Sequence, residues 1–271
     1  MRIARFAVGD EVRYGVVDAG NGSAGPGENG NGAELMIGEI SGHPFGPDEI
    51  KLTGARYPVA DVRLLAPILP SKVVAIGRNY LEHARELGNE PPAEPLIFLK
   101  PSTSVIGPGD AIVRPQQLSQ RVDFEGELAL VFGRLCREVP EARVPEVIFG
   151  YTCANDVTAR DLQASDGQWT RAKGFDTFCP LGPWIETDVD PSDVQLTTTV
   201  NGELKQDSRT SLLIHPIARL VSYVTSVMTM IPGDVLLTGT PAGVGPLVAG
   251  DNVAVQIEGI GTLANRVTDR S

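Results

Sequence analysis

Cysteine is scarce in this 271-residue sequence, and the scarcity limits where the protein can work. Only Cys136, Cys153 and Cys179 are present, an odd number without any Cys-x-x-Cys spacing. Structural disulfides are therefore not expected, and a reducing compartment fits best. The first residues also lack the apolar segment of a secretory signal. We therefore expect a cytoplasmic protein.

Basic residues are also few relative to acidic ones. The sequence has 23 Lys and Arg against 34 Asp and Glu, a formal net charge of −11. A general nucleic-acid or anionic-membrane binder needs a basic surface, so both partner classes are excluded. No run of about 18 apolar residues occurs, which excludes a transmembrane helix. An anionic small molecule remains compatible, because a bound metal or a Lys/Arg cluster can reverse the field in one cleft.

The remaining composition is that of an ordinary globular chain, with 42% hydrophobic residues. Two β-prone runs at 2–8 and 12–18 flank a short polar turn and predict a hairpin. Residues 19–34 are rich in Gly and Asn and predict a loop without regular structure. We expect a small β-rich N-terminal module over 1–66 and a main domain over 67–271.

The most informative stretch is VDFEGELALVFGR at 122–134. It reads as one strand that becomes apolar and buried towards its end. Because strand side chains alternate between faces, Asp123, Glu125 and Glu127 should share one face. Three adjacent carboxylates repel one another unless a cation lies between them, and a hard divalent ion is the natural candidate. The alternative is a solvent-facing acidic strand that discourages edge pairing.

A second candidate site follows the apolar strand predicted at 72–76. The next segment has helical character, with Asn79 as expected N-cap and Gly88 as expected stop. His83 and Glu86 are three residues apart and so lie on one helix face. A carboxylate beside an imidazole raises its basicity, as a general base requires. The alternative is an ordinary surface pair.

Three further residues fit the same chemistry. Asp156 follows a strand predicted at 148–154 and could add a carboxylate from a second strand; the alternative is that it caps the next helix. Lys173 lies among aromatic residues and glycines, where it could hold an anionic oxygen. Lys100 ends a strand and is either solvated or an anion-binding group. Residues 209–230 predict one long helix that packs on the sheet.

Seven motifs carry a resemblance to a known family, in order from about residue 72 to the C-terminus: GRNYLEHARELG, LIFLKPSTS, VDFEGELALVFGR, NDVTARDLQ, WTRAKGFDTFCPLGPW, VNGELKQDSRTSLLIH and GDVLLTGTPAGVG. Together they resemble the fumarylacetoacetate hydrolase family. The resemblance implies a mixed α+β, mainly β fold with a roll-like catalytic domain, and a homodimer. It also implies a substrate with a 2-oxo acid end.

The resemblance assigns roles to individual residues. It implies Mg²⁺ or Mn²⁺ bound by Glu125, Glu127 and Asp156, a site that could also accept Ca²⁺ in crystals. In this family a His–Glu pair activates water and a Lys polarises the substrate, and these positions correspond to the catalytic candidates His83, Glu86 and Lys173. The expected substrate contacts are Arg160, Gln163 and Thr240 from the resemblance, with Arg78, Tyr80 and Lys100 as further candidates.

The expected reaction is hydrolysis of a carbon–carbon bond in an acylpyruvate-like 2-oxo acid. Isomerisation of 2-hydroxyhepta-2,4-diene-1,7-dioate and decarboxylation of an oxaloacetate-type diacid stay open, because all three reactions share an enolate. A non-catalytic metal-binding or ligand-binding module is a further alternative. A nucleotide site is disfavoured, since the Gly-rich segment 239–245 lacks the Lys-Ser/Thr of a phosphate-binding loop.

Overall fold

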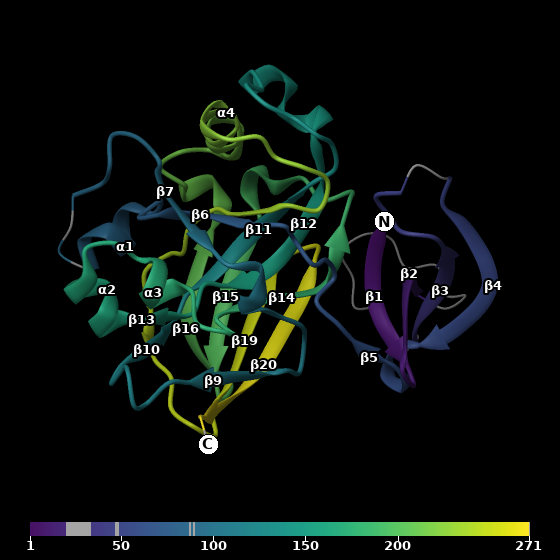
Figure 1. Cartoon of the computed structure of the whole chain (residues 1–271), viewed down its shortest axis with the longest axis horizontal. Helices are drawn as coiled ribbons and strands as arrows, with labels where there is room; N and C mark the ends of the chain where they lie inside the picture. The colour runs from purple at the N-terminus through teal and green to yellow at the C-terminus, as the bar shows by residue number, and fades with distance from the viewer. Residues whose placement is uncertain (20–33, 47–48, 87, 89, 271) are drawn as a thin grey trace.

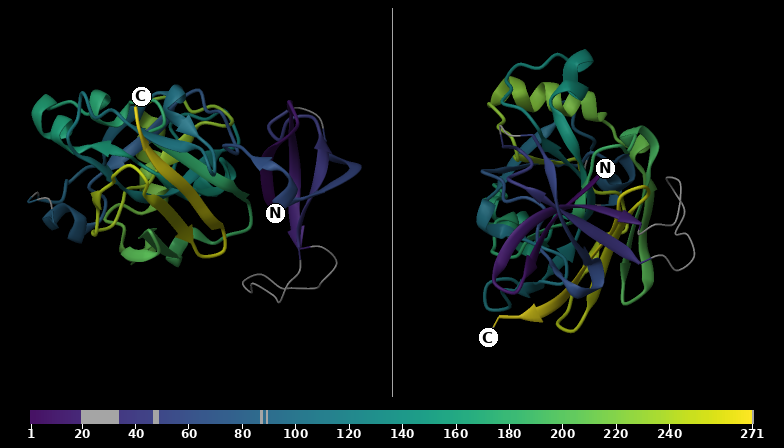
Figure 2. Two further views of the ribbon diagram at one scale, coloured as in Figure 1. Left: turned by 90° about the horizontal axis from the view of Figure 1, so that it is seen from below. Right: turned by 90° about the vertical axis from the view of Figure 1, so that its right-hand side faces the viewer.

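The computed structural model describes residues 1–19, 34–46, 49–86, 88 and 90–270. Most of the loop predicted at 19–34 lies outside the described residues. As predicted, the fold is mixed and mainly β, with a small N-terminal β unit beside a larger body (Figures 1 and 2). Among the described residues, no helix combines the length and the apolar character needed to span a bilayer.

The N-terminal unit contains the predicted hairpin. Its strands are β1 (Arg2–Val8), β2 (Glu11–Ala19), β3 (Leu35–Ser41), β4 (Lys51–Pro58) and β5 (Arg63–Leu64). Phe6 and Ile37 are fully buried in its small core together with Trp184 of the larger body. The two parts share more than this contact, because β1 pairs with a strand of the main sheet, Arg2 lying opposite Glu186 and Ile3 opposite Ile185.

The main sheet extends through both parts. Its spatial order is β4, β3, β2, β1, β14 (Cys179–Glu186), β12 (Ile148–Asn155), β11 (Gly126–Phe132), β17 (Val235–Leu237), β6 (Val73–Gly77) and β7 (Leu96–Lys100), with β5 beside β1 and β8 (Val105–Ile106) beside β14. Every residue of β11 is buried, since layers cover both faces of the sheet. This explains the nearly continuous apolar run of its sequence.

Smaller sheets and short helices complete the body. The five-stranded sheet has the order β16 (Glu203–Arg209), β15 (Gln195–Val200), β19 (Asn252–Ile257), β20 (Gly261–Asp269) and β9 (Ala111–Arg114), and the three-stranded sheet has the order β13 (Thr158–Ala159), β10 (Val122–Phe124) and β18 (Gly245–Pro246). The α-helices are α1 (Leu81–Glu86), α2 (Arg160–Asp166), α3 (Thr170–Lys173) and α4 (Ile217–Val227). Short 3-10 turns cover Val59–Asp61, Ser102–Ser104, Glu141–Glu146, Pro191–Asp193 and Thr210–Leu212.

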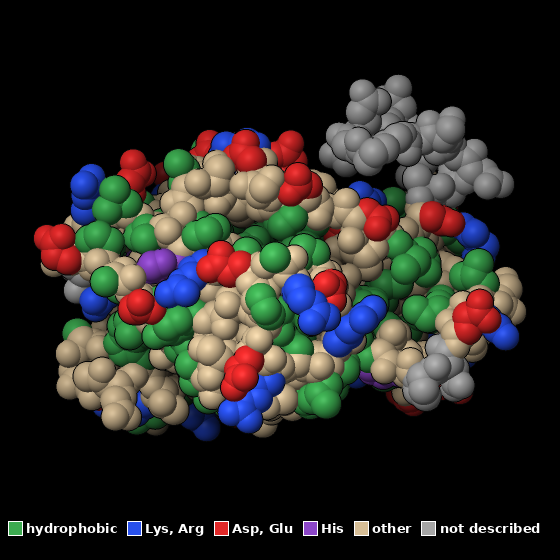
Figure 3. All heavy atoms as spheres, turned by 90° about the horizontal axis from the view of Figure 1, so that it is seen from above, with side chains coloured by type: hydrophobic (Ala, Val, Ile, Leu, Met, Phe, Trp, Pro, Cys, Tyr) green, Lys and Arg blue, Asp and Glu red, His purple; other side chains and the backbone are tan. Residues whose placement is uncertain are grey.

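The core forms on both faces of the main sheet. On one face, Leu128 and Leu130 pack with Leu220 of α4 and with the five-stranded sheet. On the other face, Ala129 and Val131 join a second buried cluster. On the molecular face in Figure 3, Lys/Arg and Asp/Glu side chains are interspersed rather than gathered by sign.

Two predicted elements are wrong in extent. The single helix expected at 209–230 is only α4. Arg209 still belongs to β16, Thr210–Leu212 form a 3-10 turn whose first N–H donates to the Val194 carbonyl, and Pro216 occupies the N-cap of α4. The single strand expected at 122–134 is two strands in different sheets, β10 and β11. The chain changes sheet at Glu125, whose N–H donates to the side chain of Asn155 (2.9 Å).

Candidate active site

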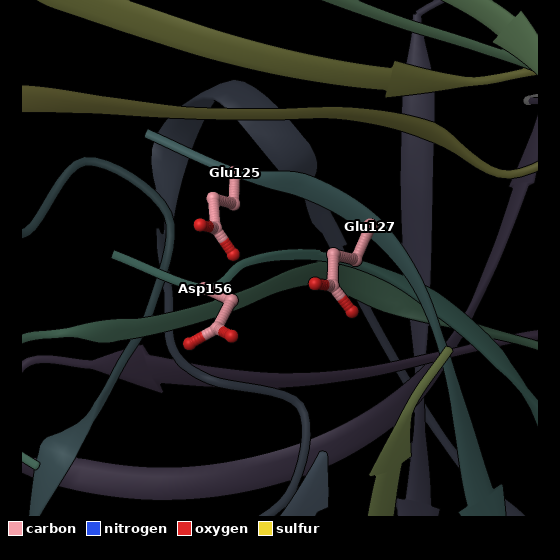
Figure 4. A group of neighbouring side chains, drawn as sticks. All are labelled: Glu125, Glu127 and Asp156. Carbon is pink, nitrogen blue, oxygen red and sulfur yellow. The ribbon is translucent and has the colours of Figure 1, made fainter. Parts of the chain in front are cut away.

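The change of sheet at Glu125 brings three carboxylates together. Glu125 lies between β10 and β11, Glu127 lies in β11, and Asp156 follows β12. Antiparallel pairing places Gly126 opposite Asn155, so the residues on either side of this pair are neighbours. One oxygen from each carboxylate lies within 4.8 Å of the others, and all three residues are at most 4% exposed (Figure 4). The solvent-facing alternative for this acidic stretch is therefore wrong.

Asp123 does not join this group, contrary to the expectation that it shares a face with both glutamates. Its carboxylate accepts hydrogen bonds from Arg121 and Arg160, each at 2.9 Å. The change of sheet between β10 and β11 interrupts the alternation that one continuous strand would have. Asp123 instead orients Arg160, whose other nitrogens donate to Glu125 (2.6 Å) and Gln163 (2.7 Å).

Two lysines neutralise much of the remaining negative charge. The Lys173 ammonium donates to Glu125 and Asp156, at 2.7 Å each. Lys100 donates to the other oxygen of Asp156 (2.6 Å) and to the Lys173 carbonyl (2.6 Å). Lys100 is 1% exposed, so the reading of a solvated strand end is wrong, and its ammonium orients Asp156 and α3.

The surroundings shift the pKa values of the two glutamates in opposite directions. Burial by itself would raise the pKa of Glu125, but Lys173 and Arg160 outweigh it and hold that pKa far below its usual range. Burial, together with the charges of Asp156 and Glu125, raises the pKa of Glu127 well above its usual range. Glu127 accepts one backbone hydrogen bond, from Gly239 (2.7 Å). Of the three carboxylates, Glu127 is therefore the one most in need of further positive charge.

The backbone between the glutamates is fixed by a side chain that we did not predict. Gln206 of β16 is 1% exposed and accepts from the Gly126 N–H (3.0 Å). Its amide nitrogen donates to the Thr240 hydroxyl and the Pro241 carbonyl, both at 2.8 Å. The Thr240 hydroxyl donates in turn to the Gly126 carbonyl (2.8 Å). Gln206 thus connects the five-stranded sheet to the acidic centre and to the Gly-rich loop.

The His–Glu pair lies beside this centre. His83 Nδ1 is 3.4 Å from Oε2 of Glu86, and both oxygens of that carboxylate accept from the Gly243 N–H, Oε1 at 3.1 Å and Oε2 at 3.2 Å. His83 is only 4% exposed, whereas Glu86 keeps 34% of its side chain exposed, so the pair is half enclosed rather than an ordinary surface pair. Burial lowers the pKa of His83, and Arg160 lowers it further, against the opposing effects of Glu125 and Glu86. The imidazole is therefore neutral at pH 7.

The segment before α1 is held differently from the prediction. Asn79 is not the N-cap: its side chain donates to the carbonyls of His215 (3.1 Å) and Thr238 (2.8 Å) and accepts from the His215 N–H (2.8 Å). These long-range hydrogen bonds satisfy the amide, so it does not bond to the first turn. Gly88 has the left-handed φ of 69° expected of a residue just beyond a helix end.

These groups surround one cavity of about 350 Å³. From the predicted set, the lining contains His83, Lys173, Arg78, Arg160, Gln163, Thr240, Glu125, Glu127 and Asp156. Lys100, Tyr80 and Glu86 lie outside it. The side chain of Lys100 is enclosed behind Asp156, and Tyr80 is buried with a pKa raised by burial and by the charge of Glu127.

An aromatic wall completes the cavity and was not predicted as part of the site. The rings of Trp169 and Phe98 meet edge to face, with centroids 5.2 Å apart. The Lys173 ammonium lies 5.1 Å from the Phe98 centroid. Gly77 leaves room for Trp169, since a Cβ there would lie 2.5 Å from the indole ring. The sequence predicted only that Lys173 lies among aromatic residues. The wall itself could not be predicted, because it forms only when Phe98 of β7 and Trp169 at the start of α3 come together in the fold.

The donor set suits a hard divalent cation. All three converging groups are carboxylates, and oxygen ligands are what Mg²⁺ and Mn²⁺ prefer. The enclosed acids are Asp123, Glu125, Glu127 and Asp156, and the enclosed bases are Lys100, Arg160 and Lys173. Counted as ionised, they leave one net negative charge, so a divalent ion would bring the centre to a net positive charge suited to an anion.

Comparison with models of protein families supports the family resemblance seen in the sequence. Residues 72–268 match the model described as fumarylacetoacetate (FAA) hydrolase C-terminal. The chain belongs to the fumarylacetoacetate hydrolase family. Residues 1–67 match a second model, described as Rv2993c-like, N-terminal. The family resemblance and the fold class predicted from the sequence are thus confirmed.

Several family members are similar over nearly the whole chain. Protein Rv2993c of Mycobacterium tuberculosis is 55% identical over 270 residues, which cover 98% of each chain. The structure of 5-carboxymethyl-2-hydroxymuconate delta-isomerase from Mycobacterium smegmatis is 53% identical, with a TM-score of 0.88 and full coverage of both chains. The structure of 2-hydroxyhepta-2,4-diene-1,7-dioate isomerase from Mycobacterium marinum is 51% identical, with a TM-score of 0.87, covering 100% of this chain and 99% of the other.

A less similar family member was solved with ligands. Maleylpyruvate hydrolase from Sphingobium sp. SYK-6, in complex with manganese(II) and pyruvate, is 32% identical, with a TM-score of 0.77 and full coverage of both chains. A hydrolase therefore shares this fold, but at lower identity than the two isomerases.

Proposed function

We propose that this chain is a divalent-metal-dependent isomerase that converts a 2-hydroxydienoic acid into its 2-oxo form. The observation that carries the proposal is the meeting of three buried carboxylates and a buried, neutral histidine at one cavity. Isomerisation stood as an alternative to hydrolysis in the sequence analysis. We place it first because the two isomerases are more similar to this chain than the hydrolase is.

Mg²⁺ or Mn²⁺ would be held by Glu125, Glu127 and Asp156. When bound, the cation supplies positive charge beside the substrate's 2-oxygen and carboxylate and so stabilises the anionic form of the acid. Lys173 is placed to add a second positive contact. Two of its three N–H groups are taken by Glu125 and Asp156, which leaves one for an oxygen in the cavity that it lines.

We assign the proton transfer to His83. Because Nδ1 faces the Glu86 carboxylate, the ring proton resides there and Nε2 keeps its lone pair. In a 2-hydroxy-2,4-dienoate, the base removes the proton from the 2-hydroxyl group. The O–H electron pair becomes part of the C2=O bond, the remaining double bond forms between C3 and C4, and C5 receives a proton. Nε2 of His83 can take the first proton and return it.

Glu86 and the aromatic wall assist this step without touching the reacting atoms. Glu86 holds the His83 tautomer, and its bond from Gly243 fixes α1 to the Gly-rich loop. Phe98 and Trp169 shield part of the cavity from water, which strengthens the charge interactions inside it.

Hydrolysis is the second candidate. A neutral histidine beside a carboxylate is also the group needed to remove a proton from an attacking water molecule. The hydrolase solved with manganese(II) and pyruvate supports this reading. A homodimer, expected from family membership, stays a prediction.

The experiment compares both reactions in one protein preparation. After chelation, Mg²⁺ or Mn²⁺ is restored, and ultraviolet absorbance follows loss of the 2-hydroxydiene of 2-hydroxyhepta-2,4-diene-1,7-dioate. Acylpyruvates are tested in parallel for release of pyruvate. We expect metal-dependent isomerisation that His83→Gln lowers by about 10²–10⁴-fold, with Glu82→Gln, on the exposed side of α1, as matched control. Turnover of acylpyruvates alone would favour hydrolysis, and no turnover of any substrate would favour a non-catalytic binding module.

A further inference from the structure

One cation in the cavity has no role in the reaction described above. Of the described residues that line the cavity, three carry a fixed positive charge: Arg78, Arg160 and Lys173. Arg160 is neutralised by Asp123 and Glu125, and Lys173 by Glu125 and Asp156. Arg78 has no ion pair or side-chain hydrogen bond within the described part of the chain. An unmatched guanidinium at a ligand cavity is suited to bind an anion.

The guanidinium of Arg78 lies against the aromatic wall. Its central carbon is 5.6 Å from the centroid of the Trp169 ring. A cation–π contact of this kind holds the group beside the ring and leaves its N–H donors free for a carboxylate.

The backbone at Arg78 is held in an uncommon conformation from both sides. Its φ is 58°, in the left-handed region that non-glycine residues seldom adopt. On one side Gly77 is packed against Trp169, and on the other Asn79 is bound to His215 and Thr238. Residues held in such conformations cluster at ligand sites. The chain thus presents Arg78 in one fixed place.

The charges around the cavity indicate how many carboxylates a bound substrate would carry. With every carboxylate ionised, as metal binding requires, the enclosed groups at the acidic centre sum to one negative charge, and a divalent ion would make the sum one positive charge. The carboxylate of a 2-oxo acid neutralises that charge and leaves Arg78 unmatched. A substrate with a second carboxylate would neutralise Arg78 as well, with its carbon chain along Phe98 and Trp169.

We infer that Arg78, in cation–π contact with Trp169, is the residue that binds the substrate carboxylate remote from the reacting 2-oxygen. The inference rests on the proposed function for the placement of the first carboxylate. It makes Arg78 a specificity-determining residue, because a monocarboxylic 2-oxo acid leaves the guanidinium without its anion. The site thus selects substrates by the charge at the end remote from the reacting 2-oxygen.

The test compares two ligands that share a 2-oxo acid end. Pyruvate has one carboxylate and 2-oxoadipate has two, and isothermal titration calorimetry measures the binding of each in saturating Mg²⁺. The proteins are wild type, Arg78→Met and Arg78→Lys. Arg85→Met, on the exposed side of α1, is the matched control. Retained pyruvate binding shows that each variant is folded and that its acidic centre is intact.

We expect Arg78→Met to weaken 2-oxoadipate binding by about 10–100-fold, since a charge-assisted hydrogen bond contributes about 1.5–3 kcal/mol. Arg78→Lys keeps the charge and should lose less, while pyruvate binding and the Arg85→Met control stay unchanged. Equal effects on both ligands, or none on either, would overturn the inference and leave the proposed function standing. If neither ligand binds to the wild type in Mg²⁺, the proposed function and the inference both fail.

Discussion

Gln206 offers the sharpest test of how the acidic centre is supported. Replacing it by Met keeps the length of the side chain and removes its polar atoms. The Gly126 N–H and the Pro241 carbonyl, which are both buried, then lose Gln206 as their hydrogen-bond partner. The Thr240 hydroxyl keeps its bond to the Gly126 carbonyl. Each orphaned buried group costs about 1–3 kcal/mol, so we expect Gln206→Met to lower the free energy of unfolding by about 2–6 kcal/mol.

The same change should weaken metal binding. Gly126 lies between two of the three proposed ligands, so movement of its backbone displaces both carboxylates. Loss of a residue that supports metal ligands typically costs about 10–100-fold in affinity. We therefore expect the Kd for Mg²⁺ to rise by that factor.

The assays are urea unfolding in the presence of a chelator, which reports stability without metal, and calorimetric titration with Mg²⁺. Gln195→Met is the matched control. Gln195 lies on the neighbouring strand of the same sheet, but it is exposed and bonds to the exposed Asp207. We expect its effect to stay within about 0.5 kcal/mol. If Gln206→Met unfolds like the control and binds Mg²⁺ like the wild type, the network does not support the centre as argued.

Three further predictions follow from the site. Burial lowers the pKa of His83 in the folded protein. Below about pH 6.5 the unfolded chain therefore protonates this histidine while the folded protein keeps it neutral. The free energy of unfolding should fall as the pH drops through that range. The acid limb of the pH–rate profile should lie below pH 6.5, and a limb above it would contradict a neutral His83. Removal of Mg²⁺ should lower the Tm, with about 2.7 kcal/mol regained at 100 times the Kd; a Tm of Glu127→Gln that responds to Mg²⁺ like the wild type would contradict the ligand assignment. Gly243→Ala should lower kcat, because its Cβ would lie 2.1 Å from the Lys205 carbonyl and displace the N–H that holds Glu86. Gly250→Ala has the same φ of 98° with nothing within 4 Å and is its control; equal kcat values for the two variants would refute the argument.

The sequence predicts best where the signal is local. The apolar run of β11, the hairpin of β1 and β2, and the placement of His83 and Glu86 on one helix face each follow from periodicity in a short segment. Glu125 and Glu127 were grouped by their spacing, Asp156 was a possible third carboxylate at the end of a second strand, and the family resemblance implied one metal for all three. The structure does bring these carboxylates together.

What escaped prediction depends on contacts between distant segments. Alternation along one strand grouped Asp123 with the glutamates, because nothing local marks the change of sheet at Glu125. Gln206 is the buried residue of β16, a strand that is otherwise partly or fully exposed, and its target Gly126 is 80 residues away in sequence. The enclosure of Lys100 likewise requires β7, Asp156 and α3 to be in place together.

The pairing of β1 with β14 has a practical consequence for anyone dividing this chain. A fragment beginning near residue 67 would lose the strand that lies opposite Ile185 and Glu186, and with it the terminal ammonium that donates to the Glu186 carboxylate (2.7 Å). Trp184 would lose Phe6 and Ile37 as packing partners in the same step. An exposed apolar strand edge recruits other copies, so such a fragment should precipitate during purification even with its catalytic groups intact.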